Sequence, residues 1–454
     1  MSSSGFDIEE LDSKNTASAE VVPSVGPDGL PIQVIQQPEP EIKDEELIDG
    51  DDQGKPARVR RFATIMNLLN SVLGIGILSV PNSLINTGVI PAVVILVLIA
   101  TLSFVATKIV IKLQLELNSE GFDDLAYKLL GKTGSIILST LSLLFLVVGL
   151  LSFLIIAGDM VMSWLRLAGV DITGLTKRAI VICVYAFLIP IALTIPRSVG
   201  FLSYFSTATF ISVMFYVGVM IYKGFTMLPS QGIHKTAVMS KIDVSMFQTL
   251  AIFGLTFSLP VVVLPVVRPY NPLLHKRSVV SVVAIIACVL LVGISGVIGY
   301  LLFGSTSNAN IINSFQNNDI LFIIVRIGFF IVVSCAYPIV SQSVMCSWSQ
   351  LFFGTNTAST LPSSRRTVVL IATNGIPLLI AIFLSSAKPA LSVGGALGGC
   401  IVNFLFPALL WLSHYDAPIS SPQKILVIFL AVFGLVAGII STYQAVIDAI
   451  ASFK

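Results

Sequence analysis

Residues 66–82 read MNLLNSVLGIGILSVPN, an apolar run with polar side chains at regular positions and glycines in its middle. Asn67, Asn70 and Gly74 recur at helical spacing and therefore share one face of a helix. Polar side chains in a bilayer normally face the interior of a helix bundle. Two mid-span glycines, Gly74 and Gly76, allow the backbone to unwind, which is tolerated at that depth only where it lines a cavity. The stretch therefore predicts a transmembrane helix with a break in the middle.

An unwound segment of this kind has a chemical use. It exposes free amide groups and the positive end of a half-helix, and both suit a carboxylate group. The same glycines would also suit close packing of two helices on small residues. The pattern by itself favours neither interpretation over the other.

A second interruption occurs in the stretch Gly254-Leu255-Thr256-Phe257-Ser258-Leu259-Pro260. Pro260 and Pro265 each lack a backbone donor, so carbonyl groups upstream of them lose their helical partners. Interrupted helices at positions one and six of a membrane protein are typical of an inverted repeat of five plus five helices that holds its substrate at the midplane. Two independent proline kinks are the alternative.

The composition places these two stretches in a membrane. Apolar residues make up 55% of the 454 residues and charged residues only 11%, against about 25% charged in a soluble domain. A spanning helix needs about 20 mostly apolar residues. Eleven such runs are predicted, at 62–85, 89–113, 134–166, 178–195, 199–223, 246–267, 278–303, 319–345, 367–386, 389–412 and 423–450. The predicted fold class is an all-α polytopic membrane protein with an extra helix after the repeat.

The charge is unevenly distributed along the chain. Residues 1–61 carry 14 acidic and 6 basic residues, whereas 62–454 carry 10 and 20. The first segment is too polar to bury a core, so we expect a disordered acidic cytoplasmic tail followed by a transmembrane domain at 62–454. With the N-terminus cytoplasmic, 15 Lys and Arg fall on the inner side and 8 on the outer side. This bias and the odd helix count predict an extracytoplasmic C-terminus.

Two ionisable residues lie inside predicted spans, Asp159 in the third and Arg326 in the eighth. Both fall in the outer half at similar depth, and a charge inside a membrane usually has a partner. They are candidate outer-gate charges that either pair with each other or are each solvated near the outer mouth. No catalytic constellation and no spacing typical of a metal site is found, so we expect no enzyme and no metal.

Several motifs together resemble the amino acid/auxin permease family, in particular its sodium-coupled neutral amino acid transporters. Their order and spacing along 62–454 carry the resemblance more than any single one does. The matching stretches are 67–81 in the first helix, 153–159 in the third, 195–197 and 201–206 around the fifth, 299–304 with 310–311 after the seventh, Arg326 with Tyr337-Pro338 in the eighth, and 406–408 in the tenth.

The resemblance implies a leucine-transporter-like inverted repeat and assigns roles to particular residues. The break at Gly74, Ile75 and Gly76 would hold the substrate carboxylate, and carbonyl groups near Phe253, Gly254 and Ser258 would hold its ammonium group. Helices 3, 6 and 8 would wall the side-chain pocket, and its apolar or hydroxylic lining favours neutral amino acids. The implied substrate-binding residues are Asn70, Gly74, Ile75, Gly76, Phe253, Gly254, Ser258 and Ser334.

Asn70 and Ser334 would also take part in coupling to a cation, Na⁺ or H⁺. The sodium-type members of the family carry hydroxyl residues at the positions of Ser334 and Ala336, so Ala336 removes one hard oxygen ligand and weakens the sodium interpretation. Apart from this co-transported ion we expect no cofactor.

The sequence thus predicts a secondary active transporter of amino acids that works by alternating access, a symporter or a weakly coupled carrier. An amino-acid-sensing transceptor that signals through its N-terminal tail is the alternative, and an ion channel is disfavoured. The expected partners are the amino acid, the lipid bilayer and cytoplasmic proteins that bind the tail, with no nucleic acid. The expected location is the plasma membrane or a lysosomal or vacuolar membrane.

Overall fold

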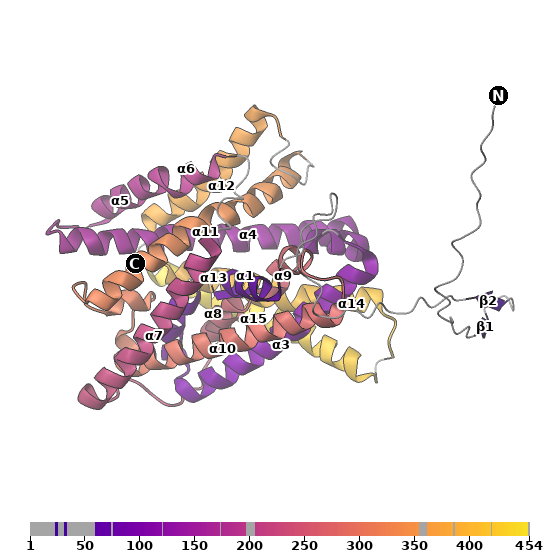
Figure 1. Cartoon of the computed structure of the whole chain (residues 1–454), viewed down its shortest axis with the longest axis horizontal. Helices are drawn as coiled ribbons and strands as arrows, with labels where there is room; N and C mark the ends of the chain where they lie inside the picture. Colours follow the sequence, from indigo (N-terminus) through magenta and orange to yellow (C-terminus); the bar gives the residue numbers. More distant parts are fainter. Residues whose placement is uncertain are drawn as a thin grey trace, which may run out of the picture. The chain divides into compact units, whose positions relative to one another are not determined.

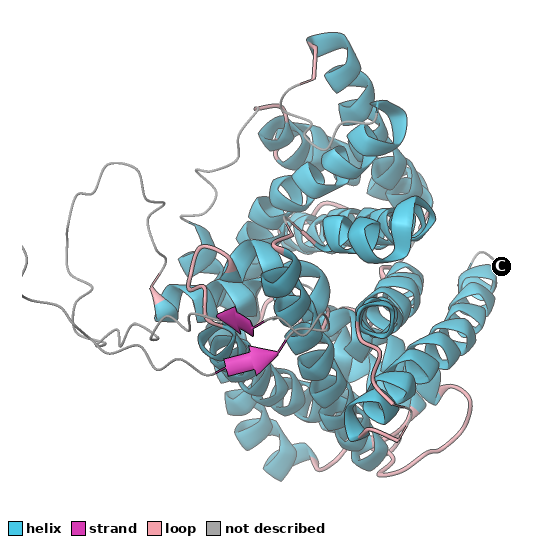
Figure 2. Cartoon of the chain, turned by 90° about the vertical axis from the view of Figure 1, so that its right-hand side faces the viewer, coloured by secondary structure: helices cyan, strands magenta, loops and turns pink. Residues whose placement is uncertain are grey.

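The structure is a computed structural model that describes residues 23–25, 31–33, 60–73, 76–119, 121–172, 174–196, 205–353, 361–384, 386–418 and 420–452. The chain divides into two units, residues 1–56 and 57–454. In the first unit, strand β1 (Pro23–Val25) pairs antiparallel with β2 (Pro31–Gln33), with Ser24 opposite Ile32 (Figure 2). The predicted disordered tail otherwise lies outside the described residues.

The second unit is helical wherever it is regular among the described residues (Figure 1). Its elements are α1 (Arg61–Leu73), α2 (Gly76–Ser83), η1 (Leu84–Asn86), α3 (Val89–Leu117), α4 (Phe122–Leu167), α5 (Leu175–Leu188), α6 (Pro190–Thr194), α7 (Phe205–Gln231), α8 (Met246–Thr256), α9 (Leu259–Val267), α10 (Leu274–Phe303), η3 (Gly304–Thr306), η4 (Ile311–Ser314), α11 (Ile320–Phe353), α12 (Ser363–Phe383), α13 (Lys388–Gly394), the π-helix η6 (Gly395–Leu405), α14 (Phe406–His414) and α15 (Pro422–Ser452).

These helices confirm the predicted polytopic membrane fold. Ten helices or helix pairs in the described part of the chain are long and apolar enough to cross a bilayer, and α1 with α2 makes an eleventh when counted as one span bent by 49°. In chain order the spans are α1–α2, α3, α4, α5–α6, α7, α8–α9, α10, α11, α12, α13–η6–α14 and α15.

The helix α4 consists of two helical parts that meet at Gly131, where φ is 70° and ψ is −172°. The part after Gly131 agrees with the predicted third span at 134–166, and residues 122–130 form a short helix before it that the search for apolar runs did not predict. This left-handed backbone conformation is inexpensive only for glycine. The polar residues Asp123 and Asp124 in the first turn concealed the helix from a search for apolar runs.

Burial distinguishes the spans that form the centre from those that face lipid. The most apolar windows of the sixth and tenth spans are each 72% buried, against 22% for the fourth span. Large apolar side chains such as Val94, Phe187 and Ile286 are exposed on the outer helices. In Figure 1, α1, α8 and α9 lie in the middle of the helical body. The interrupted spans therefore lie at the centre of the bundle.

The packing of the first five spans recurs among the next five. α1 contacts α9, and α2 contacts α8, so the first and sixth spans run antiparallel. α3 packs on α9 as α10 packs on α2, and α4 packs on α12 as α11 packs on α6. α7 contacts α11 as the tenth span contacts α4. Exchanging each span with the one five places away thus preserves the contact pattern, and α15 packs outside this set, on η6 and α8.

Candidate functional site

The two helix breaks lie side by side in the centre of the bundle. Gly76 is the first residue of α2, and Thr256 is the last residue of α8. A Cβ atom placed on Gly76 would lie 2.5 Å from Thr256 Oγ1. This close approach explains why residue 76 has no side chain. Close packing on a small residue is therefore realised at Gly76, whereas the use of this segment to bind a carboxylate stays a prediction.

The predicted carboxylate-binding residues of the first span are only partly described. Gly74 and Ile75 lie outside the described residues, between the end of α1 and the start of α2. Asn70 is in the last turn of α1, where it is half-buried and engaged in an interaction. The start of α2 lies next to the sixth span, because Gly76 approaches Thr256.

The carbonyl groups freed in the sixth span already accept hydrogen bonds from side chains. Gly254 O accepts from Ser258 Oγ at 2.9 Å and from Asn403 Nδ2 at 3.2 Å. Phe257 O accepts from Ser103 Oγ at 2.6 Å. Phe253 is buried beside the break. A ligand ammonium at this position would therefore share or displace these donors.

Asn403 is a residue of this site that the sequence analysis missed. It lies in the π-helix η6, is fully buried, and its Oδ1 has no hydrogen-bond partner among the described residues. The backbones meet here, since a Cβ on Gly254 would lie 2.8 Å from Gly399 O. The available signal was a single asparagine in the apolar stretch 393–412 of the tenth span, because a polar side chain at that depth needs an interior partner.

The structure does not show Ser334 at the helix breaks. Ser334 is 5% exposed, and its Oγ lies 3.0 Å from Tyr185 Oη on α5. Its helix, α11, packs on α4, α6, α7 and α12. The contact of Ser334 with Tyr185 thus connects the eighth span with the fourth, and the role of Ser334 at a cation site stays a prediction.

Asp159 and Arg326 do not pair with each other. Asp159 Oδ1 lies 3.8 Å from Arg178 Nη2, and its Oδ2 accepts a hydrogen bond of 3.1 Å from Asn313 Nδ2. The predicted pairing is wrong because Asp159 has a nearer partner in Arg178, the first residue of the predicted fourth span. In the structure Arg178 lies in the first turn of α5, beside the third span.

Arg326 is fully buried and binds backbone instead of a carboxylate. Its Nη2 donates to Ile312 O at 3.1 Å and to Phe315 O at 3.2 Å. Asp159 reaches the same segment through Asn313. The two charges therefore hold one connection, the one between the seventh and eighth spans, from two different helices.

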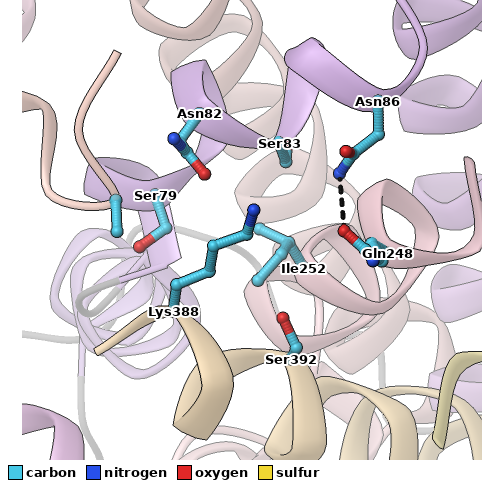
Figure 3. Close-up of a pocket in the computed structure, with 9 residues that line it drawn as sticks. Ser79, Asn82, Ser83, Asn86, Gln248, Ile252, Lys388 and Ser392 are labelled. Atoms are coloured by element: carbon cyan, nitrogen blue, oxygen red, sulfur yellow. Dashed lines mark hydrogen bonds between the residues drawn. The ribbon is translucent and has the colours of Figure 1, made fainter. Parts of the chain in front are cut away.

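A small pocket lies between α2, α8 and α13, and the sequence did not predict it (Figure 3). Lys388, the first residue of α13, extends into it from one side. Asn86 Nδ2 donates to Gln248 Oε1 at 3.0 Å on the other side. The lining residues are Ser79, Asn82, Ser83, Asn86, Gln248, Ile252, Ala309, Lys388 and Ser392.

Comparison with known proteins identifies the family of this chain. A profile of the family described as "Transmembrane amino acid transporter protein" matches residues 60–447. The chain is 24% identical over 420 residues to a mouse protein named "Putative sodium-coupled neutral amino acid transporter 11", with 88% of each chain covered. The bovine protein of that name is 21% identical over 427 residues, which cover 90% of this chain and 88% of the relative.

A further relative is longer than this chain. Mouse "Solute carrier family 38 member 10" is 22% identical over 374 residues, which cover 80% of this chain but only 34% of that protein. The similarity to all three proteins extends over most of the membrane unit. The chain belongs to the transmembrane amino acid transporter family, the amino acid/auxin permeases, and is a multi-pass integral membrane protein.

Proposed function

We propose that this protein is a secondary active transporter of neutral amino acids that works by alternating access. The observation that carries the proposal is the meeting of two broken spans, five places apart, at the buried centre of the bundle. Half-helix ends and unwound backbone in a bilayer serve to bind charged groups of a substrate. An amino acid offers both a carboxylate for the α2 amides and an ammonium group for the carbonyls of Gly254 and Phe257.

The preference for neutral side chains rests on what surrounds the breaks. Phe253, Thr256 and Ser258 are buried there, and none of them carries a charge. A charged substrate side chain would need a partner of opposite sign in this region. The names of the mouse and bovine relatives point to the same class of substrate.

The repeated packing of the spans supports the proposed transport mechanism. The exchange of each span with the one five places away supports an inverted repeat of the leucine-transporter type. Two antiparallel halves of similar packing can adopt either of two related arrangements, one open to each side of the membrane. A gradient of Na⁺ or H⁺, rather than covalent chemistry, would supply the work. We place the N-terminus in the cytoplasm, the C-terminus outside it, and the protein in the plasma membrane or an internal membrane.

Reconstitution into liposomes tests this function. Purified protein is assayed for uptake of a mixed panel of amino acids under an imposed Na⁺ gradient, an imposed H⁺ gradient, or neither. We expect saturable uptake of neutral amino acids that one gradient accelerates. Gly76→Trp is expected to abolish uptake while the protein still elutes as a single folded species. Uptake that does not saturate, or normal uptake by Gly76→Trp, contradicts the proposal.

A further inference from the structure

The pocket between α2, α8 and α13 contains a positive charge without a negative one. Lys388 is the one charged residue among those that line it, and none is acidic. Its ammonium group has no hydrogen-bond or ion-pair partner among the residues that the structure describes. An unpaired ammonium group in a partly desolvated position favours an anionic ligand.

Asp243, an acidic residue of the loop before α8, is already paired. Its carboxylate lies 3.0 Å from the Lys241 ammonium group. Hydrogen bonds from Ser245 and Lys241 hold the pKa of Asp243 below its ordinary value. Ser245 connects this pair to the pocket wall by donating to Asn86 O at 3.1 Å. The loop thus brings no net negative charge to balance Lys388.

A second, independent observation comes from Ser79. This residue is only 4% exposed, and its buried hydroxyl has no hydrogen-bond partner among the described residues. Buried polar groups nearly always have a partner, so the hydroxyl of Ser79 is available to a molecule or ion in the pocket. Ser392 is also buried, and its hydroxyl points into the pocket (Figure 3).

The walls that carry these groups are held in place by other contacts. Thr249 Oγ1 donates to Ser83 O at 2.7 Å and joins α8 to α2, and the bond between Asn86 and Gln248 joins η1 to α8 at the pocket wall. The walls formed by α2, η1 and α8, which include Ser79, are therefore held together independently of any ligand.

We propose that this pocket binds a small monovalent anion through the Lys388 ammonium and the Ser79 hydroxyl. The anion has two chemical sources, a free ion such as chloride or the carboxylate of the amino acid itself. The second source rests on the proposed transport function. Ser79 lies three residues after Gly76, so an amino acid bound here by its carboxylate is about one helical turn from the break. In that case the pocket is a first binding site for the substrate on its path from the outer surface to the midplane.

Thermal unfolding of the purified full-length protein tests the anion site without transport. Sodium chloride or sodium acetate replaces sodium gluconate, a bulky anion, at constant ionic strength. We expect both small anions to raise the unfolding midpoint, and Lys388→Gln to weaken their apparent affinity about tenfold, the loss expected for one charged hydrogen bond. Ser79→Ala should weaken it less. Lys388→Arg and Lys235→Gln, which removes an exposed lysine outside the pocket, should behave as wild type. An identical response of wild type and Lys388→Gln overturns the proposal.

Uptake into proteoliposomes separates the two sources. If the substrate carboxylate is the ligand, Lys388→Gln raises KM about tenfold with kcat retained, and external chloride has no effect. If a free anion is the ligand, wild-type uptake depends on external chloride and Lys388→Gln loses this dependence. Absence of uptake by the wild type would refute the transport function, whereas the thermal response to anions would still stand.

Discussion

Gly76 sets how closely the first and sixth spans approach each other. Its missing side chain leaves only enough room for Thr256, which itself donates to Ile252 O at 2.8 Å. Close packing in protein interiors makes an added methyl group costly when the neighbour cannot move. A single atom, Thr256 Oγ1, therefore limits how closely α2 and α8 approach each other at the two breaks.

Gly76→Ala is expected to lower uptake at least tenfold, because the new Cβ forces α2 and α8 apart. Thr256→Ala removes the Oγ1 atom that clashes, so the double variant Gly76→Ala/Thr256→Ala should recover part of the lost uptake. Initial rates in proteoliposomes measure both effects. If the uptake rate of the double variant is no higher than that of Gly76→Ala alone, contact with Thr256 is not the reason that residue 76 must be glycine.

Asn70→Ala tests the proposed cation site. We expect its uptake to lose dependence on the Na⁺ or H⁺ gradient while the protein still inserts and folds. Asn67→Ala, one turn earlier on the same helix, is the matched control and should retain the dependence. An unchanged cation response of Asn70→Ala would remove this residue from the coupling site.

The ion pair of Asp159 with Arg178 gives a different expectation from the one based on sequence. Their side chains are only 19% and 12% exposed. Removing one partner of a buried pair leaves an uncompensated charge and costs about 3 kcal/mol. Asp159→Asn and Arg178→Gln should therefore each lower the thermal unfolding midpoint, and the double variant should lower it less than the two losses added.

The tenth span contributes a packing surface made of backbone. A Cβ on Gly399 would lie 2.4 Å from Gly254 C, and one on Gly395 would lie 2.1 Å from Ala251 O. These neighbours are backbone atoms of α8 and cannot rotate away. In the π-helix of this span each backbone hydrogen bond joins residues five apart, whereas an α-helix joins residues four apart. Single turns of π-helix are frequent at functional sites. Together these contacts hold α8 against the tenth span, next to the break in the sixth.

Gly399→Ala is expected to destabilise the protein by about 1–3 kcal/mol and to lower uptake, because overpacking here must displace backbone. Gly149→Ala in α4 is the control, since nothing lies within 4 Å of a Cβ at that position. It should be neutral or stabilising by up to about 1 kcal/mol. Thermal unfolding of the two variants measures both changes in stability. A loss of stability in Gly399→Ala but not in Gly149→Ala assigns the loss to the contact between α8 and η6 rather than to any added methyl group.

The chain as a whole consists of an acidic first segment and a basic helical unit that begins at residue 57. The two have separate roles if the protein is a transporter, and coupled roles if it is a sensor that signals through its tail. The packing of the ten paired spans and α15 is contained within the second unit. Nothing in the described contacts of the helix breaks requires the first 55 residues.

Deleting residues 1–55 is therefore expected to leave KM and the initial uptake rate within about twofold of the full chain, because the helix breaks and their partners remain. Uptake into proteoliposomes with matched protein content measures this. Loss of uptake by a truncated protein that still folds would instead favour the sensing function.

The sequence determined the membrane fold, because long apolar runs with few charges can satisfy their backbone only as spanning helices. It also placed both helix breaks, since Gly74–Gly76 and Pro260 act on the local backbone wherever they occur. Asn70 and Ser334 were assigned by resemblance, and the structure leaves those roles as predictions. The amphipathic first turns of α4 were missed because hydropathy does not register polar helix ends.

Only the tertiary structure decided which side chains meet. Three contacts join residues from different spans. They are the ion pair of Asp159 with Arg178 rather than with Arg326, the approach of Gly76 to Thr256, and the hydrogen bond from Asn403 to Gly254. Lys388 and Ser79 also belong to different spans, and only the folded bundle brings them to one pocket. The physical reason is that helix periodicity fixes the face of each residue, whereas the rotation and neighbours of a helix depend on packing across the whole bundle.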